Sequence, residues 1–86
     1  MGKVKVHFNA VGNAPILRKS KFFVDSNKPF ASLTSFLLNE LHVDSLFLYC
    51  DAAFMPAPDA LIFQLFECFA SRGELVVNYS TTPAYG

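Results

Sequence analysis

The residue of this chain with the clearest chemical potential is Gly86, the last residue of the uncharged segment STTPAYG. Because glycine has no Cβ, its carboxylate is the least hindered acyl donor that a chain can present, and it fits narrow active-site channels. Such a carboxylate can be adenylated, passed to a thiolate and joined to a lysine amine. The segment is equally compatible with a frayed terminus without a role, because the ends of most domains are poorly ordered. Both interpretations stay open on this segment alone.

The other reactive side chains do not form the set that an enzyme needs. Asp51 and Asp59 flank a proline-rich loop, where a turn and a helix cap are their expected roles. Cys50 and Cys68 are expected to be buried and inert, since burial in apolar surroundings raises the pKa of a thiol. The two cysteines and two histidines have no metal-ligand spacing, and the glycines in VGNAP and SRG form no phosphate cradle. We therefore expect no catalytic residue, no metal and no cofactor.

Composition indicates one domain with its own core. The chain has 86 residues, of which 52% are hydrophobic, so we expect a core that needs no disulfides. The formal net charge is zero, which argues against nucleic acid and anionic membranes as partners. No apolar run approaches the ~20 residues of a membrane span. The beginning, MGKVKVHF, lacks the apolar region of a signal peptide, so we expect a cytoplasmic protein.

The first 26 residues predict a hairpin. Residues 3–8 alternate strictly, with Val4, Val6 and Phe8 on one face and polar residues on the other. A turn rich in Asn, Gly and Pro follows, and residues 21–26 form a second short strand.

Two helices and two further strands follow. Residues 26–43 predict a helix with Ser26 or Asn27 near its cap. Residues 45–50 are apolar almost throughout, which favours a central strand covered on both faces. Asp59 is the expected cap of a second helix. The apolar face of the first helix comprises Phe30, Leu33, Leu37 and Leu41. The second helix is predicted over residues 60–70, and the last strand over residues 74–79.

The order ββαβαβ favours an α+β fold, with a mixed four-stranded sheet and its helices on one face. The crossover from the second to the third strand should be parallel and right-handed. A small mixed sheet with a long first helix is the ubiquitin-like β-grasp arrangement, and the opening hairpin disfavours a ferredoxin-like fold. We assign residues 1–79 to this domain and residues 80–86 to a flexible C-terminal tail that ends in the reactive glycine.

Four segments occur in order along the chain: AVGNAPIL, LFLYCDAAFMPAPD, LFECFASRGELVVNYS and PAYG. Together they resemble the family of autophagy-related protein 12, a group of ubiquitin-like modifiers, over nearly the whole chain. The chain departs from this family at Phe22 and Tyr85, where the family has tryptophan, and in the shorter segment NELHVD. Both replacements keep an aromatic ring, although Tyr85 adds a hydroxyl.

The resemblance implies a mechanism and a set of partners. The E1-like autophagy-related protein 7 would adenylate Gly86 and take it as a thioester, and the E2-like autophagy-related protein 10 would accept it. The product would be an isopeptide bond to a lysine of autophagy-related protein 5. With autophagy-related protein 16, this conjugate would act like an E3, recruiting the E2-like autophagy-related protein 3 to lipidate autophagy-related protein 8. The protein would then be recruited from the cytoplasm to the forming autophagosome, without inserting into the membrane.

The resemblance also implies recognition residues. Ala84 and Tyr85 would be recognised by the E1-like and E2-like enzymes. A basic and aromatic patch would bind an acidic and apolar peptide of a partner enzyme, and its residues are expected to converge at one end of the sheet. This patch comprises Lys3, Lys21, Phe22 and Phe54, with Met55 as adaptable apolar surface. Phe63, Phe66 and Phe69 are expected in the core and as a docking surface for autophagy-related protein 5.

Two alternatives remain at this point. One is a non-covalent ubiquitin-like module that binds autophagy-related protein 5 without conjugation and does not need its tail. The other is a β-grasp sulfur carrier, in which the terminal glycine becomes a thiocarboxylate. Such carriers usually end in two glycines, and this chain ends in AYG.

Overall fold

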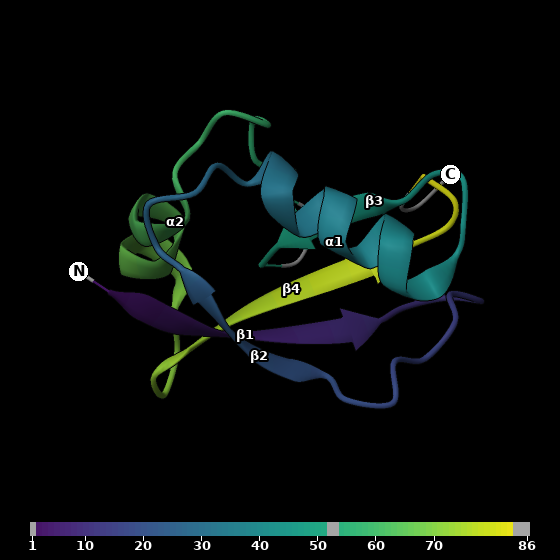
Figure 1. The fold of residues 1–86 in the computed structure, drawn as a ribbon, viewed down its shortest axis with the longest axis horizontal. Helices are drawn as coiled ribbons and strands as arrows, with labels where there is room; N and C mark the ends of the chain where they lie inside the picture. The colour runs from purple at the N-terminus through teal and green to yellow at the C-terminus, as the bar shows by residue number, and fades with distance from the viewer. Residues whose placement is uncertain (1, 52–53, 84–86) are drawn as a thin grey trace.

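The computed structural model describes residues 2–51 and 54–83, which form a four-stranded sheet and two helices (Figure 1). The elements follow the predicted order ββαβαβ. They are β1 (Lys3–Ala10), β2 (Lys21–Asp25), α1 (Ala31–Leu41), β3 (Phe47–Cys50), α2 (Ile62–Phe69) and β4 (Glu74–Ser80). The predicted boundary between domain and tail, after residue 79, therefore falls one residue before the end of β4.

The first and last strands form the centre of the sheet, in which the strand order is β2-β1-β4-β3. β1 and β4 are parallel, whereas β2 is antiparallel to β1 and β3 is antiparallel to β4. β2 and β3 consequently run in the same direction, as expected for the crossover through α1, but they lie at opposite edges. The prediction of a central strand at residues 45–50 is wrong, because β4 lies between β1 and β3.

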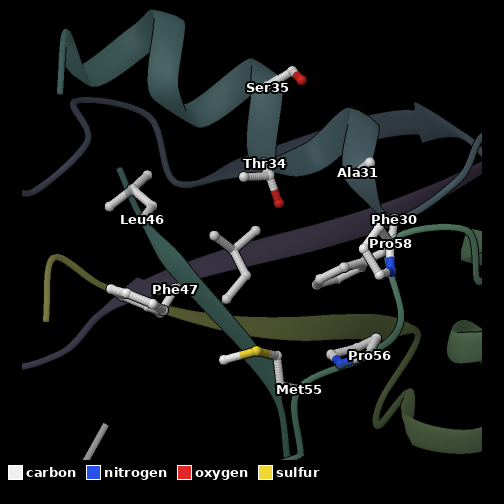
Figure 2. A pocket seen from close by; sticks show the side chains of 10 residues that line it. Phe30, Ala31, Thr34, Ser35, Leu46, Phe47, Met55, Pro56 and Pro58 are labelled. Atoms are coloured by element: carbon white, nitrogen blue, oxygen red, sulfur yellow. The ribbon is translucent and has the colours of Figure 1, made fainter. Parts of the chain in front are cut away.

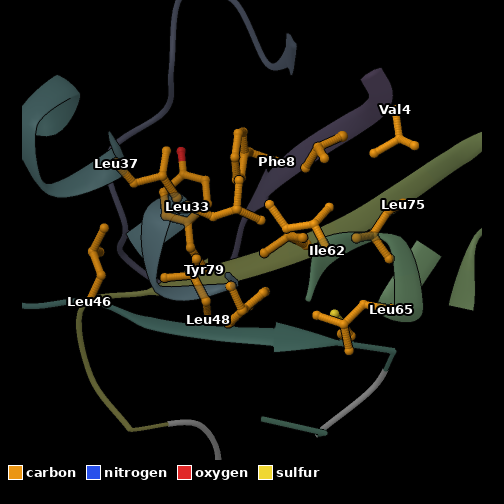
Figure 3. Packing of buried hydrophobic residues seen from close by; sticks show 14 of the residues in the cluster. Val4, Phe8, Leu33, Leu37, Leu46, Leu48, Ile62, Leu65, Leu75 and Tyr79 are labelled. Carbon is orange, nitrogen blue, oxygen red and sulfur yellow. The ribbon is translucent and has the colours of Figure 1, made fainter. Parts of the chain in front are cut away.

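One face of the sheet carries the hydrophobic core, and α1 lies across this face (Figure 1). Val4, Val6 and Phe8 are buried on it, as their alternation predicts. α1 contributes Leu33 and Leu37, again at the predicted helical spacing. Figure 3 shows Val4, Phe8, Leu33 and Leu37 packed with residues of β3, α2 and β4 and with Leu46, which precedes β3; the others are Leu48, Ile62, Leu65, Leu75 and Tyr79.

Neither helix begins where the sequence predicted. The N-cap of α1 is Phe30 and that of α2 is Leu61, and no side-chain hydrogen bond caps either helix. The predicted N-caps, Ser26 or Asn27 for α1 and Asp59 for α2, are therefore wrong. Ser26 is fully buried instead, and its hydroxyl donates to the carbonyl of Gly2 at 2.9 Å.

Backbone groups replace the missing caps, because the first amides of each helix bond to the segment that precedes the other helix. This exchange satisfies donors that a capping side chain would otherwise serve. It also fixes the proline-containing loop after β3 against the start of α1. The four bonds are Phe30 N to Ala60 O (2.7 Å), Ala31 N to Pro58 O (2.9 Å), Ile62 N to Lys28 O (3.0 Å) and Phe63 N to Ser26 O (2.9 Å).

Tyr79 fastens the end of β4 to the loop that follows β1. Its ring is 1% exposed, and its hydroxyl donates to the carbonyl of Pro15 at 2.5 Å. Its own carbonyl accepts a hydrogen bond from the amide of Val11 at 3.0 Å. Burial raises the pKa of the Tyr79 hydroxyl, so the group stays a neutral donor. These bonds hold the strand from which the C-terminal tail departs.

We expect Tyr79→Phe to lower the free energy of unfolding by about 1 kcal/mol, because the Pro15 carbonyl loses its partner while the packing of the ring is kept. Urea denaturation of the two proteins at the same pH measures the difference. An unchanged unfolding midpoint would show that the hydroxyl does not contribute to holding this loop.

Candidate functional site

The candidate site is the face of the sheet that carries no helix, called here the open face. It consists of the side chains that alternate with the core residues along β1, β2 and β4. Because successive side chains of a strand point to opposite faces, these residues project away from α1. The residues of the open face used below are Lys3, Lys5, His7, Lys21, Phe23, Glu74 and Val76.

Glu74, the first residue of β4, is the carboxylate on which the basic side chains of the open face converge. Its carboxylate is 3.1 Å from Lys21 Nζ and 3.4 Å from Lys5 Nζ, and His7 Nδ1 lies 3.7 Å from its second oxygen. The hydrogen bond from Lys21, together with that from Lys5, lowers the pKa of the Glu74 carboxyl. Two lysines thus surround one carboxylate, which holds their side chains in place. The group of Lys5, Lys21 and Glu74 therefore keeps a net positive charge, called here the positive surplus.

An exposed aromatic ring lies beside this cluster. Phe23 is 67% exposed, and the ammonium of Lys5 lies 6.0 Å from the centre of its ring. Lys5 is directly opposite Phe23 in the β1–β2 register, so the ring and the charge share one row across the sheet. A cation near an aromatic face is the arrangement that suits acidic and apolar ligands.

A second apolar area adjoins the open face on its β4 side. Phe54, 49% exposed, stacks on Phe69 with ring centres 5.3 Å apart. Phe69 and Val76 line a common hollow with Asn78. Phe54 is therefore connected to the open face through Phe69 and Val76.

The predicted patch residues do not all meet at one end of the sheet, so that expectation is wrong. Lys3 and Lys21 are both on the open face, but Lys3 lies opposite Asp25 and Lys21 lies opposite His7, at the two ends of the hairpin. Met55, 51% exposed, lines a groove beside α1 instead. Ala84, Tyr85 and Gly86, the predicted tail site, lie outside the described residues.

Phe22 lies on the other face of β2. It is half-buried among aromatic side chains, with ring centres 5.9 Å from Phe8 and 4.9 Å from Phe36, and Lys19 Nζ lies 5.3 Å from its centre. Its neighbour Phe23 shares the face of Lys21. Sequence reasoning did not single out Phe23, although the period of two that links it to Lys21 was available as a signal.

The two cysteines differ in their surroundings. Cys50 is fully buried, and burial, followed by the nearby charge of Asp51, raises the pKa of its thiol to about 11. Cys68 is exposed, so the expectation of burial is wrong for this residue. Ile62 and Leu65 are the buried residues of α2, and Cys68, in its last turn, is not among them although it follows Leu65 by three residues.

Phe63, Phe66 and Phe69, on the same helix, are each partly exposed, and Phe66 and Phe69 pack against the core. Within residues 2–51 and 54–83, no three His, Cys, Asp or Glu side chains are placed to share a metal ion. No helix in this same part of the chain is long and apolar enough to cross a membrane.

We expect the Glu74 cluster to stabilise the fold in a pH-dependent way. A carboxyl with a lowered folded-state pKa contributes stability above the usual Glu value of about 4.3, and this contribution is lost as the pH falls through the lowered value. Glu74→Gln should therefore be less stable than the parent protein at pH 7, and the two should converge in acid. Urea denaturation between pH 7 and pH 2 measures this difference, with Glu67→Gln, on the exposed side of α2, as the control. A Glu74→Gln deficit that does not change with pH would contradict the ion-pair interpretation.

Comparison with known proteins assigns a family to this arrangement. The family model described as ubiquitin-like autophagy protein Apg12 matches residues 3–86. The ubiquitin-like protein ATG12 of Oryza sativa subsp. indica is 46% identical over 84 residues, which cover 98% of this chain and 90% of the relative.

Solved structures show the same fold. Atg8 of Trypanosoma brucei superposes with a TM-score of 0.86 at 19% identity, covering 98% of this chain and 77% of its own. Atg8 of Plasmodium falciparum, solved with an Atg3 peptide from that organism, gives 0.83 at 20% identity, with coverage of 94% and 77%. The prediction of a ubiquitin-like β-grasp fold is confirmed.

Proposed function

Because this chain belongs to the family of the ubiquitin-like autophagy protein Apg12, we propose that it is a modifier joined through Gly86 to a lysine of autophagy-related protein 5. The observation that carries the proposal is the family match, which extends to Gly86 itself. The protein is the transferred group in this reaction and not its catalyst. It acts in the cytoplasm and at the forming autophagosome.

The transfer has three steps. In the active site of the E1-like autophagy-related protein 7, the Gly86 carboxylate attacks the α-phosphorus of ATP and releases pyrophosphate. An enzyme thiolate then displaces AMP, and the thioester passes to a thiolate of autophagy-related protein 10. Finally the amine of the target lysine displaces that thiol, loses a proton and forms the isopeptide bond. Ala84 and Tyr85 are the residues by which the two enzymes recognise the tail.

The domain supports this role because it holds the first residues of the tail where they leave β4. Ser80, the last residue of β4, is 5% exposed, and its hydroxyl oxygen accepts a hydrogen bond from the amide of Thr82 at 3.2 Å. Thr82 and Pro83 are exposed. The six residues after Ser80 reach at most ~20 Å when fully extended. An enzyme that receives Gly86 must therefore approach the end of the sheet where β4 stops.

The open face is the proposed docking surface for the next enzyme in the pathway. The conjugate, with autophagy-related protein 16, acts like an E3 that recruits the E2-like autophagy-related protein 3 for lipidation of autophagy-related protein 8. The positive surplus around Glu74 and the exposed rings of Phe23 and Phe54 suit an acidic and apolar segment of that enzyme. Plasmodium falciparum Atg8, which has the same fold, was solved in complex with an Atg3 peptide, which supports an Atg3-type enzyme as the partner.

Deletion of Gly86 should abolish the covalent product with autophagy-related protein 5, because no other residue supplies the same unhindered carboxylate. The measurement is a denaturing gel of a reconstituted reaction containing ATP and both enzymes. Gly86→Ala, which restores the length of the tail, separates the need for length from the need for glycine. A product that survives the deletion would overturn the proposal. ATP-independent binding with no heavier band in the parent protein would favour the non-covalent alternative.

Replacement of both Lys21 and Phe54 by alanine should weaken binding of autophagy-related protein 3 by about tenfold or more, since charged and aromatic residues dominate interface energetics. The Gly86 bond should form normally. Isothermal titration measures the affinity, and Lys19→Ala, on the opposite side of β2, is the matched lysine control. Equal losses in the control and in the double variant would place the interface elsewhere.

A further inference from the structure

A groove separates α1 from β3, on the side of the molecule away from the basic hairpin. Its volume is about 270 Å³. Figure 2 shows Ala31, Thr34 and Ser35 of α1 on one wall of the groove. The loop that follows β3 supplies Met55, Pro56 and Pro58 on another wall, and Phe47 of β3 lies along the side. Phe30 and Leu48 are almost fully buried within it, at 3% exposure each.

The groove exists because the loop leaves the strand at a proline. Phe54 pairs antiparallel with Cys50, and the two residues exchange both backbone hydrogen bonds, at 2.7 and 3.2 Å. Two residues further along, Pro56 has no amide hydrogen with which to continue such pairing. Pro58 then binds the start of α1, where its carbonyl accepts from the amide of Ala31. The loop is thereby drawn away from β3.

This departure leaves part of the β3 edge available. β3 pairs with β4 on one side only. Because the N–H and C=O of Cys50 point outward to Phe54, those of Leu48 also point outward, by the period of two along a strand. Within the described part of the chain, no residue other than those of β4 pairs with Leu48. An unpaired edge of this kind is a template for an added strand.

The charge around the groove has one sign. Residues 29–71, which supply every side chain of the groove, contain no lysine and no arginine but five acidic residues. Two of them are exposed and lie close in the chain to residues of the groove: Asp44, two residues before Leu46, and Asp59, next to Pro58. The hairpin, by contrast, carries most of the lysines. A ligand that fits the groove and its rim is therefore cationic as well as apolar.

We propose that the β3 edge and this groove bind an extended segment of another protein in which one large apolar residue is flanked by lysines or arginines. The segment adds a strand to β3 by pairing with the backbone of Leu48. Its apolar side chain enters the groove between Ala31 and Met55, and its cationic side chains face Asp44 and Asp59. This surface lies at the opposite edge of the sheet from β2 and does not depend on the role proposed for Gly86.

The probe is a fluorescent peptide of sequence KVKFKVK, titrated with the full chain by fluorescence anisotropy. Binding should weaken by about tenfold or more when the groove is filled by Ala31→Leu, and by a similar factor when the rim is reversed by Asp44→Lys with Asp59→Lys. Phe23→Ala, on the open face, should leave it unchanged. The peptides EVEFEVE and KVKGKVK, which lack the charge and the anchor respectively, should bind at least tenfold more weakly. Bound KVKFKVK should also slow hydrogen exchange at the Leu48 amide.

Several results would overturn the proposal. Tighter binding of EVEFEVE than of KVKFKVK, or a loss caused by Phe23→Ala, would place the peptide on the open face, and equal affinity for the two peptides would exclude recognition by the acidic rim. Affinity unchanged in both the groove and the rim variants would exclude the groove. Self-association in sedimentation experiments that Ala31→Leu abolishes would make a second copy of the chain the occupant. The rim variant keeps the test decisive if Ala31→Leu fails to fold, because Asp44 and Asp59 are both exposed.

Discussion

The parallel pairing of β1 with β4 is the constraint on which the rest of the structure depends. It joins the first strand to the last, and its register places Val6 beside Leu75 in the core and Lys5 beside Glu74 on the open face. A slip by one residue would exchange the two faces, burying the lysines and exposing the core. The same pairing sets the position of the cationic cluster and the point from which the C-terminal tail departs. Because the partners lie far apart in sequence, this register depends on side-chain alternation in both strands.

The two segments that precede the helices are held by backbone hydrogen bonds rather than by side-chain caps. Each helix start donates to the segment before the other helix, so the fold fixes two loops and two helix ends with the same four hydrogen bonds. Ser26 shows what this arrangement replaces: it was expected at a cap, and it is buried against Gly2 instead. The prolines of the loop after β3 then acquire a structural consequence. Pro56 ends the short pairing with β3, and Pro58 supplies an acceptor to α1.

Local periodicity made part of this structure predictable. The alternation in β1 and the helical spacing in α1 gave the correct buried residues, since both depend on neighbours within one element. The position of β3 could not be derived in this way, because a run of apolar residues indicates burial and does not say which strand lies beside it. For the site, the sequence likewise did not show which face of the sheet Phe22 occupies. Family resemblance marked it as a contact, whereas its pairing opposite Val6 places it on the helix-covered face. Phe23, one residue later, carries the exposed ring.

A formal net charge of zero conceals a separation of charge that bears directly on partners. Six of the seven lysines and arginines occur in the first 28 residues, and five of the seven acids lie between residues 29 and 71. Folding places the first group around the β1–β2 hairpin and the second around β3 and the two helices. The absence of a net charge therefore argues only against long-range steering toward a polyanion, and at contact distance we expect the two regions to favour partners of different sign. Because β2 and β3 are the two opposite edges of the sheet, we expect ligands of the hairpin and of the β3 edge to compete only near Phe54, the proposed open-face contact that pairs with Cys50 of β3.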